Sequence, residues 1–197
     1  TDTTNNRARE LALEGAPEGT LVVAEKQAAG RGRRGKVWES PLGTGIWMSL
    51  VLRPQIMPAE ASVLTLLCGL ATAEAIEVET GLSVGIKWPN DILINGKKAV
   101  GILTEMDCEM SQVHFVIPGI GINVNTTSFP PEIADIATSL YLECGKTVSR
   151  RRLVHKVLER LEEHYETFLR TGSFTAMLED YRKHCITLGK EVHLSLI

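Results

Sequence analysis

The segment from Val84 to Leu103, VGIKWPNDILINGKKAVGIL, decides the fold class. Its apolar runs are short and rich in β-branched residues, as in strands, and Pro89 excludes a helix at Trp88. Asn95-Gly96 is the strongest hairpin turn signal in the chain. The segment therefore predicts a hairpin-rich sheet, with strands over residues 84–87, 92–94 and 98–105.

The rest of the chain adds strands and helices to this segment. Further strands are predicted over residues 21–24, 46–52, 113–117, 120–124 and 191–197. Helices are predicted over residues 7–14, 58–79, 149–169 and 174–184. Because strands outnumber helices and are mostly joined by hairpins, we expect an α+β fold: a mixed, mostly antiparallel sheet with helices packed on one face.

Composition limits the class of protein. The chain has 197 residues, 44% hydrophobic and 23% charged, which fits one globular domain. Its four cysteines are far apart and lack histidines at ligand spacing, so neither a zinc site nor a disulfide framework is predicted. The net charge of -3 argues against nucleic-acid coating, and no segment resembles a signal peptide or a membrane span. We expect a cytoplasmic protein with neither nucleic acid nor membrane as a partner.

Positive charge nevertheless gathers in one glycine-rich loop, GRGRRG at residues 30–35, with Gln27 before it and Trp38 after it. Five cationic residues and no acid lie between Lys26 and Lys36. Glycines let the backbone approach a ligand, and arginines pair with phosphate or carboxylate oxygens. The spacing is neither a P-loop nor a dinucleotide-binding pattern. An anion site of another kind is predicted, the alternative being a solvated basic loop.

A second candidate follows the strand at residues 84–87. Asn90 and Asp91 supply oxygen ligands of the kind that Mg²⁺ uses beside nucleotide phosphates. The hairpin returns Lys97 and Lys98 near them, and only one of these lysines can face the site because strand residues alternate. The alternative is a turn with solvated lysines.

A third candidate is GIGINVN at residues 119–125, where Asn123 could contact a purine edge. Alone, this pattern is more typical of a glycine-containing core strand. The triple arginine at residues 150–152 opens a helix, so a solvated face is preferred there to a second anion site.

Taken in order, these motifs resemble the signature series of biotin-protein ligases over nearly the whole chain. The series comprises Gln27 with GRGRRG, KWPND at 87–91, Lys98 before GIL at 101–103, and GIN at 121–123; Thr3-Thr4-Asn5 resembles the opening of the family's catalytic domain. The resemblance implies the class II synthetase-like biotin/lipoate ligase fold. It also implies an ATP-dependent ligase that forms biotinyl-5′-AMP and transfers biotin to a lysine of a biotin carboxyl carrier protein, an acetyl-CoA carboxylase subunit.

Site residues follow from the resemblance position by position. Arg33 and Lys98 would be catalytic, Asn90 and Asp91 would lie near Mg²⁺, and Asn123 would contact adenine. ATP and Mg²⁺ are the implied cofactors, biotin is the substrate, and a homodimer is compatible with the family. The residues implied to hold biotin and the adenylate are Thr3, Thr4, Asn5, Gln27, Gly30, Arg31, Gly32, Arg33, Arg34, Gly35, Trp38, Lys98, Gly101 and Asn123.

The chain departs from the family pattern at both ends. Residues 1–187 are expected to be the catalytic domain without its usual first strand, and no DNA-binding domain is expected. Residues 188–197 resemble only the first strand of a truncated C-terminal SH3-like barrel. Two alternatives stay open: a lipoate-type ligase or transferase, which carries a different glycine-arginine motif, and a non-catalytic biotin- or nucleotide-binding regulatory module.

Overall fold

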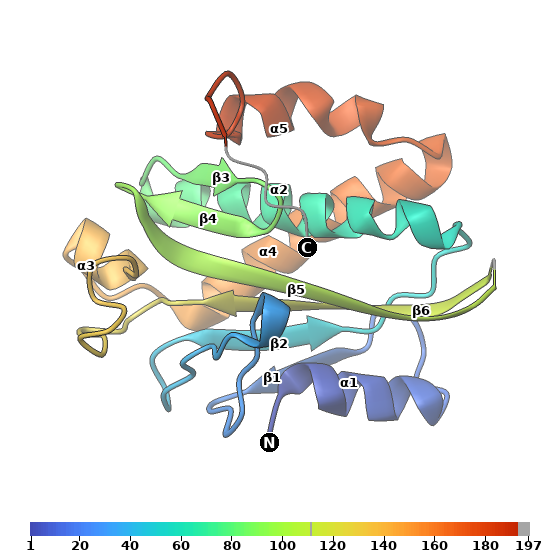
Figure 1. The fold of residues 1–197 in the computed structure, drawn as a ribbon, viewed down its shortest axis with the longest axis horizontal. Coiled ribbons are helices and arrows are strands. Elements are labelled where there is room, and N and C mark those ends of the chain that lie inside the picture. The colour runs from blue at the N-terminus through green and yellow to red at the C-terminus, as the bar shows by residue number, and fades with distance from the viewer. Residues whose placement is uncertain (111, 193–197) are drawn as a thin grey trace.

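The computed structural model of the protein describes residues 1–110 and 112–192. Its central element is one six-stranded sheet (Figure 1). The strand order is β1-β2-β6-β5-β4-β3, and every pair of neighbours is antiparallel. The α+β class and the antiparallel sheet are thus confirmed. The strands are β1 (Leu21–Ala24), β2 (Ile46–Leu50), β3 (Gly85–Lys87), β4 (Asp91–Ile94), β5 (Lys97–Glu109) and β6 (Gln112–Ile122).

The hairpin predicted around Asn95-Gly96 is present between β4 and β5. Both turn residues have positive φ, 50° at Asn95 and 82° at Gly96, which suits the tight turn that such a pair favours. The pairing of β4 with β5 shifts by one residue between Ile92 and Leu93. Ala99 is therefore an extra residue in β5, without a partner in β4. This β-bulge changes which side chains of β5 share a face.

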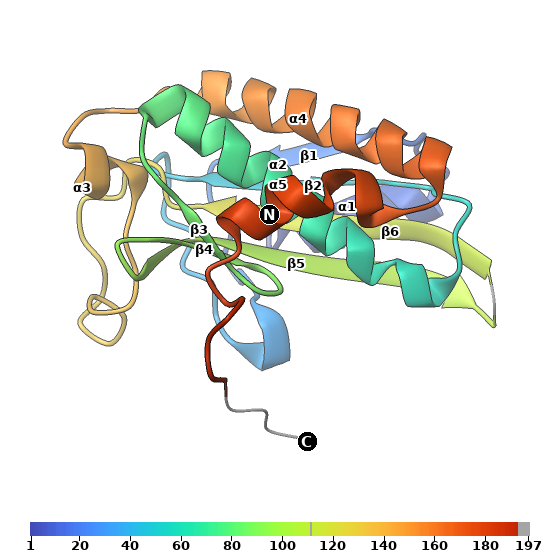
Figure 2. The ribbon, with the colours of Figure 1, turned by 90° about the horizontal axis from the view of Figure 1, so that it is seen from above.

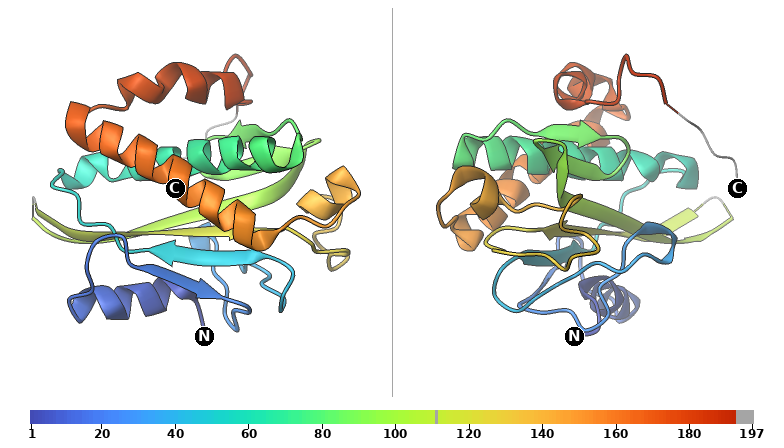
Figure 3. Two further views of the ribbon diagram at one scale, coloured as in Figure 1. Left: turned by 180° about the vertical axis from the view of Figure 1, so that it is seen from behind. Right: turned by 60° about the vertical axis from the view of Figure 1, so that its left-hand side comes forward.

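Two helices, α2 (Ser62–Thr80) and α4 (Arg150–Thr171), cover one face of the sheet, and α5 (Leu178–His184) packs on α2 (Figures 1, 2 and 3). Ser149 caps the start of α4, and Gly81 ends α2 in the left-handed conformation. Residues 58–80 are apolar and long enough to cross a membrane, but 61% of their most apolar window is buried. Helix α2 packs between the sheet and α4, so its apolar composition is that of a core helix.

The remaining long helix, α1 (Thr4–Leu13), lies on the opposite face, against β1, β2 and β6. Ala8 and Ala12 pack there against Val51, Phe115 and Ile117. The expectation that all helices share one face was therefore wrong. Phe115 and Ile117 are apolar residues on the second face of β6, so this face also needs a cover.

Other boundaries differ from the sequence prediction. The strands expected over residues 113–117 and 120–124 are one strand, β6, because β5 pairs without interruption opposite Pro118 and Gly119. A short helix, α3 (Leu140–Cys144), was not predicted. The 3-10 turns η1 (Arg33–Gly35), η2 (Pro58–Glu60) and η3 (Phe174–Met177) complete the elements. Of the expected final strand, residues 191 and 192 are coil and the rest lies outside the described residues.

Candidate functional site

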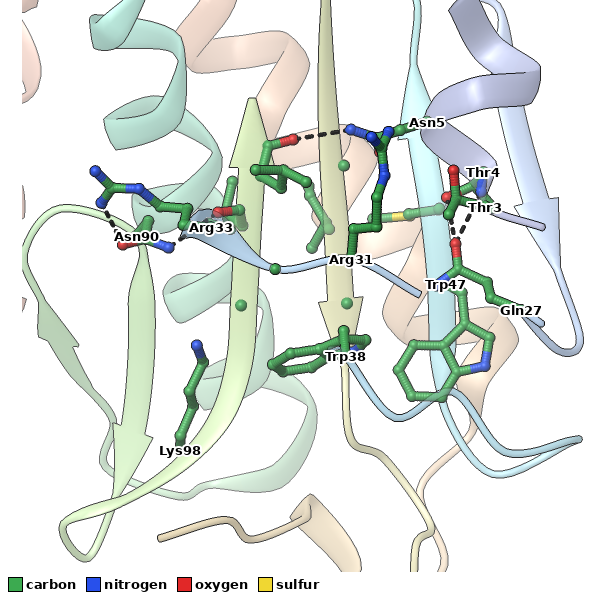
Figure 4. Close-up of a pocket in the computed structure, with 18 residues that line it drawn as sticks. Thr3, Thr4, Asn5, Gln27, Arg31, Arg33, Trp38, Trp47, Asn90 and Lys98 are labelled. Atoms are coloured by element: carbon green, nitrogen blue, oxygen red, sulfur yellow. Dashed lines mark hydrogen bonds between the residues drawn. The ribbon is translucent and has the colours of Figure 1, made fainter. Parts of the chain in front are cut away.

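The floor of the candidate site consists of three glycines, which we call the glycine floor: Gly101, Gly119 and Gly121. They lie on the face of β5 and β6 that also carries α1, next to the first turn of that helix. Gly101 and Gly121 are cross-strand partners, and the Trp38 ring lies on both (Figure 4). A Cβ at Gly101 would lie 2.7 Å from that ring, and a Cβ at Gly121 would lie 2.5 Å from its Nε1. Only glycine allows the indole to approach the sheet so closely.

One side of the site is a network of uncharged polar side chains, the neutral wall: Thr4, Asn5, Gln27, Ser40 and Ser49. The backbone N–H and the hydroxyl of Thr4 both donate to Gln27 Oε1, at 2.8 and 3.1 Å. Gln27 Nε2 in turn donates to the Ser40 hydroxyl at 2.9 Å. Thr3 caps α1 and thereby holds Thr4 and Asn5 at the start of the helix. These bonds fix the wall in one arrangement.

Asn5 is the buried centre of the neutral wall, only 6% exposed. Its Nδ2 donates to Glu105 Oε2 at 2.7 Å and to the Leu103 carbonyl at 3.2 Å. Its Oδ1 accepts a hydrogen bond of 2.6 Å from the Ser49 hydroxyl. A Cβ at Gly119 would lie 2.0 Å from this oxygen, so the glycine floor also determines where Asn5 can sit.

The opposite side of the site is the basic loop, residues 30–35. The loop is closed by hydrogen bonds from Trp38 N to the Gly30 carbonyl and from Gly32 N to the Lys36 carbonyl, at 2.9 and 2.6 Å. Arg34 and Gly35 have φ of 58° and 73°, so the turn between them is left-handed. The backbone of the loop thus folds over the floor in a tight turn.

Arg31 and Arg33 extend from the loop in different directions (Figure 4). Arg31 Nη2 donates to Asn6 Oδ1 at 2.7 Å and lies 3.2 Å from Glu105 Oε1. Arg33 Nη1 donates to Asn90 Oδ1 at 2.9 Å. Both side chains are exposed at the rim, where a bound anion could replace these partners.

Lys98 enters the site from β5 because of the bulge at Ala99. Its Nζ forms an ion pair of 2.7 Å with Asp91 Oδ1 and lies 5.1 Å from the centre of the Trp38 ring. Lys97 Nζ instead donates to the Ala134 carbonyl, away from the floor. Of the two lysines, Lys98 therefore lies at the main cavity and Lys97 does not.

Comparisons with known proteins agree with one another. The model of the biotin/lipoate A/B protein ligase family matches residues 1–123. The chain is also 34% identical, over its whole length and 72% of the relative, to the biotin--[acetyl-CoA-carboxylase] ligase of Mycobacterium tuberculosis. The chain belongs to the biotin/lipoate A/B protein ligase family.

Further matches include a bifunctional ligase/repressor and two solved structures of biotin protein ligases. It is 50% identical to the bifunctional ligase/repressor BirA of Bacillus spizizenii, over 94% of the chain and 58% of that relative. Among solved structures, the biotin protein ligase of Aquifex aeolicus in complex with biotin and ATP matches 96% of the chain and 77% of its own, with 36% identity and a TM-score of 0.81. The Leishmania major enzyme in complex with biotinyl-5-AMP matches all of the chain and 82% of its own, with 26% identity and a TM-score of 0.79.

The family fold brings most of the predicted site residues together around two cavities. The main cavity, of about 50 Å³, lies between the neutral wall and the basic loop. The adjoining cavity, of about 520 Å³, opens beyond Trp38 and adds Arg34, Asp91 and Asn123. Gly30 and Gly35 line neither. The predicted residues at the main cavity are Thr3, Thr4, Asn5, Gln27, Arg31, Gly32, Arg33, Trp38, Asn90, Lys98 and Gly101.

Asn90, Asp91 and Asn123 already have partners within the protein. Asn90 Oδ1 faces Arg33, and Asp91 is paired with Lys98. Asn123 is 5% exposed, and its Nδ2 donates to the Thr138 carbonyl at 3.1 Å. Two cations at the predicted magnesium ligands do not fit a metal held by the protein alone. The described residues also contain no group of three or more His, Cys, Asp or Glu side chains that could hold a metal.

Residues at the site that the sequence prediction missed include Trp47, Ser49 and Glu105. Trp47 lines the main cavity, and its buried Nε1 has no hydrogen-bond partner. Ser49 is fully buried in β2 and holds Asn5. A polar residue in the otherwise apolar strand IWMSLVL was a signal for Ser49. Nothing in the sequence distinguished Glu105 from a solvated strand residue.

Proposed function

We propose that this chain is the catalytic domain of an ATP-dependent biotin protein ligase. The enzyme would form biotinyl-5′-AMP from biotin and ATP, and would then transfer biotin to a lysine of a biotin carboxyl carrier protein. One observation carries the proposal: a neutral polar wall and three cationic side chains, Arg31, Arg33 and Lys98, meet across a single glycine floor. Such a site suits a substrate with an uncharged polar end and an anionic end.

The neutral wall is proposed to hold the uncharged end of biotin. A cyclic urea has N–H donors and a carbonyl acceptor, and the wall carries hydroxyl and amide groups of both kinds. Thr4, Asn5 and Gln27 are already oriented by hydrogen bonds, so little ordering is needed when the ligand binds. The Trp47 ring also lines this cavity and would add an apolar surface beside the wall.

The cationic side chains are proposed to act on the phosphate. A biotin carboxylate attacks the α-phosphorus of ATP, a P–O bond forms, and pyrophosphate leaves. Arg31, Arg33 and Lys98 would offset the charge that develops on the phosphate oxygens, and the glycine floor lets it approach the backbone. We therefore assign Arg33 and Lys98 the catalytic roles, and no protein nucleophile is needed.

The second step requires the intermediate to stay bound until the carrier arrives. The carrier lysine amine attacks the carbonyl carbon of the mixed anhydride, a C–N bond forms, and AMP leaves with the electron pair of the broken C–O bond. The basic loop is proposed to cover the anhydride and exclude water until then. The adjoining cavity, with Arg34, Lys87 and Asn123 on its wall, is proposed to take the nucleotide base and sugar.

A biotin-dependent exchange of labelled pyrophosphate into ATP tests the first step. Exchange that requires biotin supports the ligase, and its absence in a preparation that binds biotin supports the non-catalytic regulatory module instead. Chelation of divalent ions in the same assay tests the expected need for Mg²⁺. Calorimetric titration with biotin and with lipoate separates the two ligase types, since the family model covers both.

The domain and cellular assignments are also proposals. We propose that residues 1–187 form the catalytic domain, that residues 188–197 begin the small C-terminal domain, and that the protein is cytoplasmic. For this chain we propose ligase activity without nucleic-acid binding, because its net charge is -3 and Arg31 and Arg33 lie at the cavity rim. Sedimentation with and without biotin would establish whether a homodimer forms.

A further inference from the structure

Glu105 contacts both halves of the site. It lies on β5, beyond Gly101 and Leu103 on the same face, and its carboxylate meets Asn5 of the neutral wall and Arg31 of the basic loop. Of the side chains described around the main cavity, none is acidic. Glu105 lines a neighbouring cavity of about 320 Å³ that shares Arg33, Asn90 and Leu103 with the main one. Glu105 therefore places a negative charge beside Arg31, as Asp91 does beside Lys98.

We infer that Glu105 is a positioning residue with two separable effects, one on each half of the site. As a hydrogen-bond acceptor it would set the orientation of the Asn5 amide. As a negative charge it would hold the Arg31 guanidinium at the rim of the main cavity until a phosphate competes for it. The inference rests on the proposed function, since it requires a ligand with a polar end and a phosphate.

The orientation of Asn5 follows from what a carboxylate can do. An ionised carboxylate only accepts hydrogen bonds, so the group that faces it across 2.7 Å must be the Asn5 nitrogen. The Asn5 oxygen is thereby turned toward Ser49 and the glycine floor. Removing the acceptor would leave a buried N–H with only the Leu103 carbonyl, at 3.2 Å.

The restraint on Arg31 must be weak enough to release. The side chains of Arg31 and Glu105 are 46% and 41% exposed, and both carboxylate oxygens lie 3.2 to 3.3 Å from one guanidinium nitrogen. Water screens an ion pair at this exposure, so a phosphate can displace it. When Arg31 leaves Glu105 and binds the phosphate, the basic loop that carries Arg31 would move with it. Adenylate binding would thereby be coupled to closure of the loop.

Glu105→Gln separates the two effects because glutamine keeps an acceptor oxygen and loses the charge. Calorimetric titration would use biotin alone and a non-hydrolysable biotinyl-5′-AMP analogue that retains the phosphate. We expect the Gln variant to bind biotin within about twofold of wild type and the analogue about threefold to fivefold more tightly. Glu105→Ala should bind biotin at least about fivefold more weakly, because Asn5 loses its acceptor.

Asp107 supplies a matched control on the same strand and face. Its carboxylate also pairs with an arginine, Arg9, at 3.0 Å, but it lines none of the cavities at the site. Asp107→Asn should bind both ligands as wild type does. Thermal unfolding of each variant would show whether a loss of binding comes from a loss of folded protein.

A double-mutant cycle tests whether the gain passes through Arg31. In an Arg31→Ala background, Glu105→Gln should change analogue affinity by less than about twofold. The inference is overturned if the gain persists there, if the Gln variant binds the analogue no more tightly than wild type, or if biotin and analogue affinities change by the same factor. Failure of wild type itself to bind biotin would overturn the proposed function, and the inference with it.

Discussion

The neutral wall and the basic loop face each other across one floor, yet they are built in opposite ways. Thr4, Asn5 and Ser49 are buried and joined by hydrogen bonds to neighbours from three elements. Arg31 and Arg33 are exposed and held by a few contacts at the rim. The wall has one arrangement, whereas the loop can exchange partners. We therefore propose that the wall recognises the ligand and that the loop activates and retains it.

Gly119→Ala would break the wall and should have the largest effect. The new Cβ would lie 2.0 Å from Asn5 Oδ1, and Asn5 is buried with no room to withdraw. Overpacking at such sites costs about 1 to 3 kcal/mol, to which displaced hydrogen bonds of Asn5 add about 1 kcal/mol each. We expect biotin affinity to fall by about a hundredfold or more and the chemical denaturation midpoint to drop.

Gly69→Ala is the control for this substitution. Gly69 is buried in α2, and a Cβ there would meet only Ile102 Cδ1, at 3.8 Å. Alanine favours a helix over glycine by about 0.5 to 1 kcal/mol, so stability should stay level or rise. Equal loss of biotin binding in both variants would refute the special role of the Gly119 position.

Lys98→Ala should have the next largest effect, and it compares the two lysines of the hairpin. Lys98 faces the main cavity and Lys97 does not. The lost charge-assisted contact should cost about 1.5 to 3 kcal/mol in adenylate binding, or about tenfold to a hundredfold in affinity. Titration of Lys97→Ala should give a value close to wild type. Equal impairment of the two variants would mean that the assignment of faces does not govern binding.

Arg33→Gly sharpens the comparison because it should impair retention more than adenylation. The change removes the contact with Asn90 and adds a fourth glycine to the loop, while Arg31 and Lys98 still meet the phosphate. The reactive intermediate should escape severalfold faster and label exposed lysines of albumin, detected by streptavidin blotting. Arg34→Gly is the matched control, since Arg34 has φ of 58°, which glycine tolerates, and lines only the adjoining cavity. Intact pyrophosphate exchange without extra labelling would show that Arg33 does not retain the intermediate.

The smallest expected effect is on the backbone of the loop. Biotin and ATP together should slow tryptic cleavage at Arg31, Arg33 and Arg34 severalfold, because a bound anion removes the repulsion among these side chains. Cleavage at Lys190, which lies in a bend and lines none of the cavities described at the site, serves as the internal reference. Unchanged cleavage of the loop at saturating ligand would mean that it does not close.

By itself, the sequence determined the parts of this protein that depend on neighbouring residues. Asn95-Gly96 predicted the turn, the GRGRRG stretch predicted a glycine-rich loop, and the apolar run after Pro58 predicted the core helix. These features are local because turn geometry, glycine conformation and helical periodicity are set within a few residues.

Tertiary structure alone decided where the charges of the site point. Simple alternation along β5 places Lys98 on the face of Val100 and Ile102, and the bulge at Ala99 turns it to the face of Gly101. The partners of Asn5 and Arg31 include Glu105, about a hundred residues away from Asn5 along the chain. A bulge depends on the register with β4, and a carboxylate in a strand has the same local pattern whether it meets water or an arginine. Only the packing of distant segments distinguishes these cases. The sequence motifs could therefore predict which residues lie at the main cavity, but not which partners these residues contact.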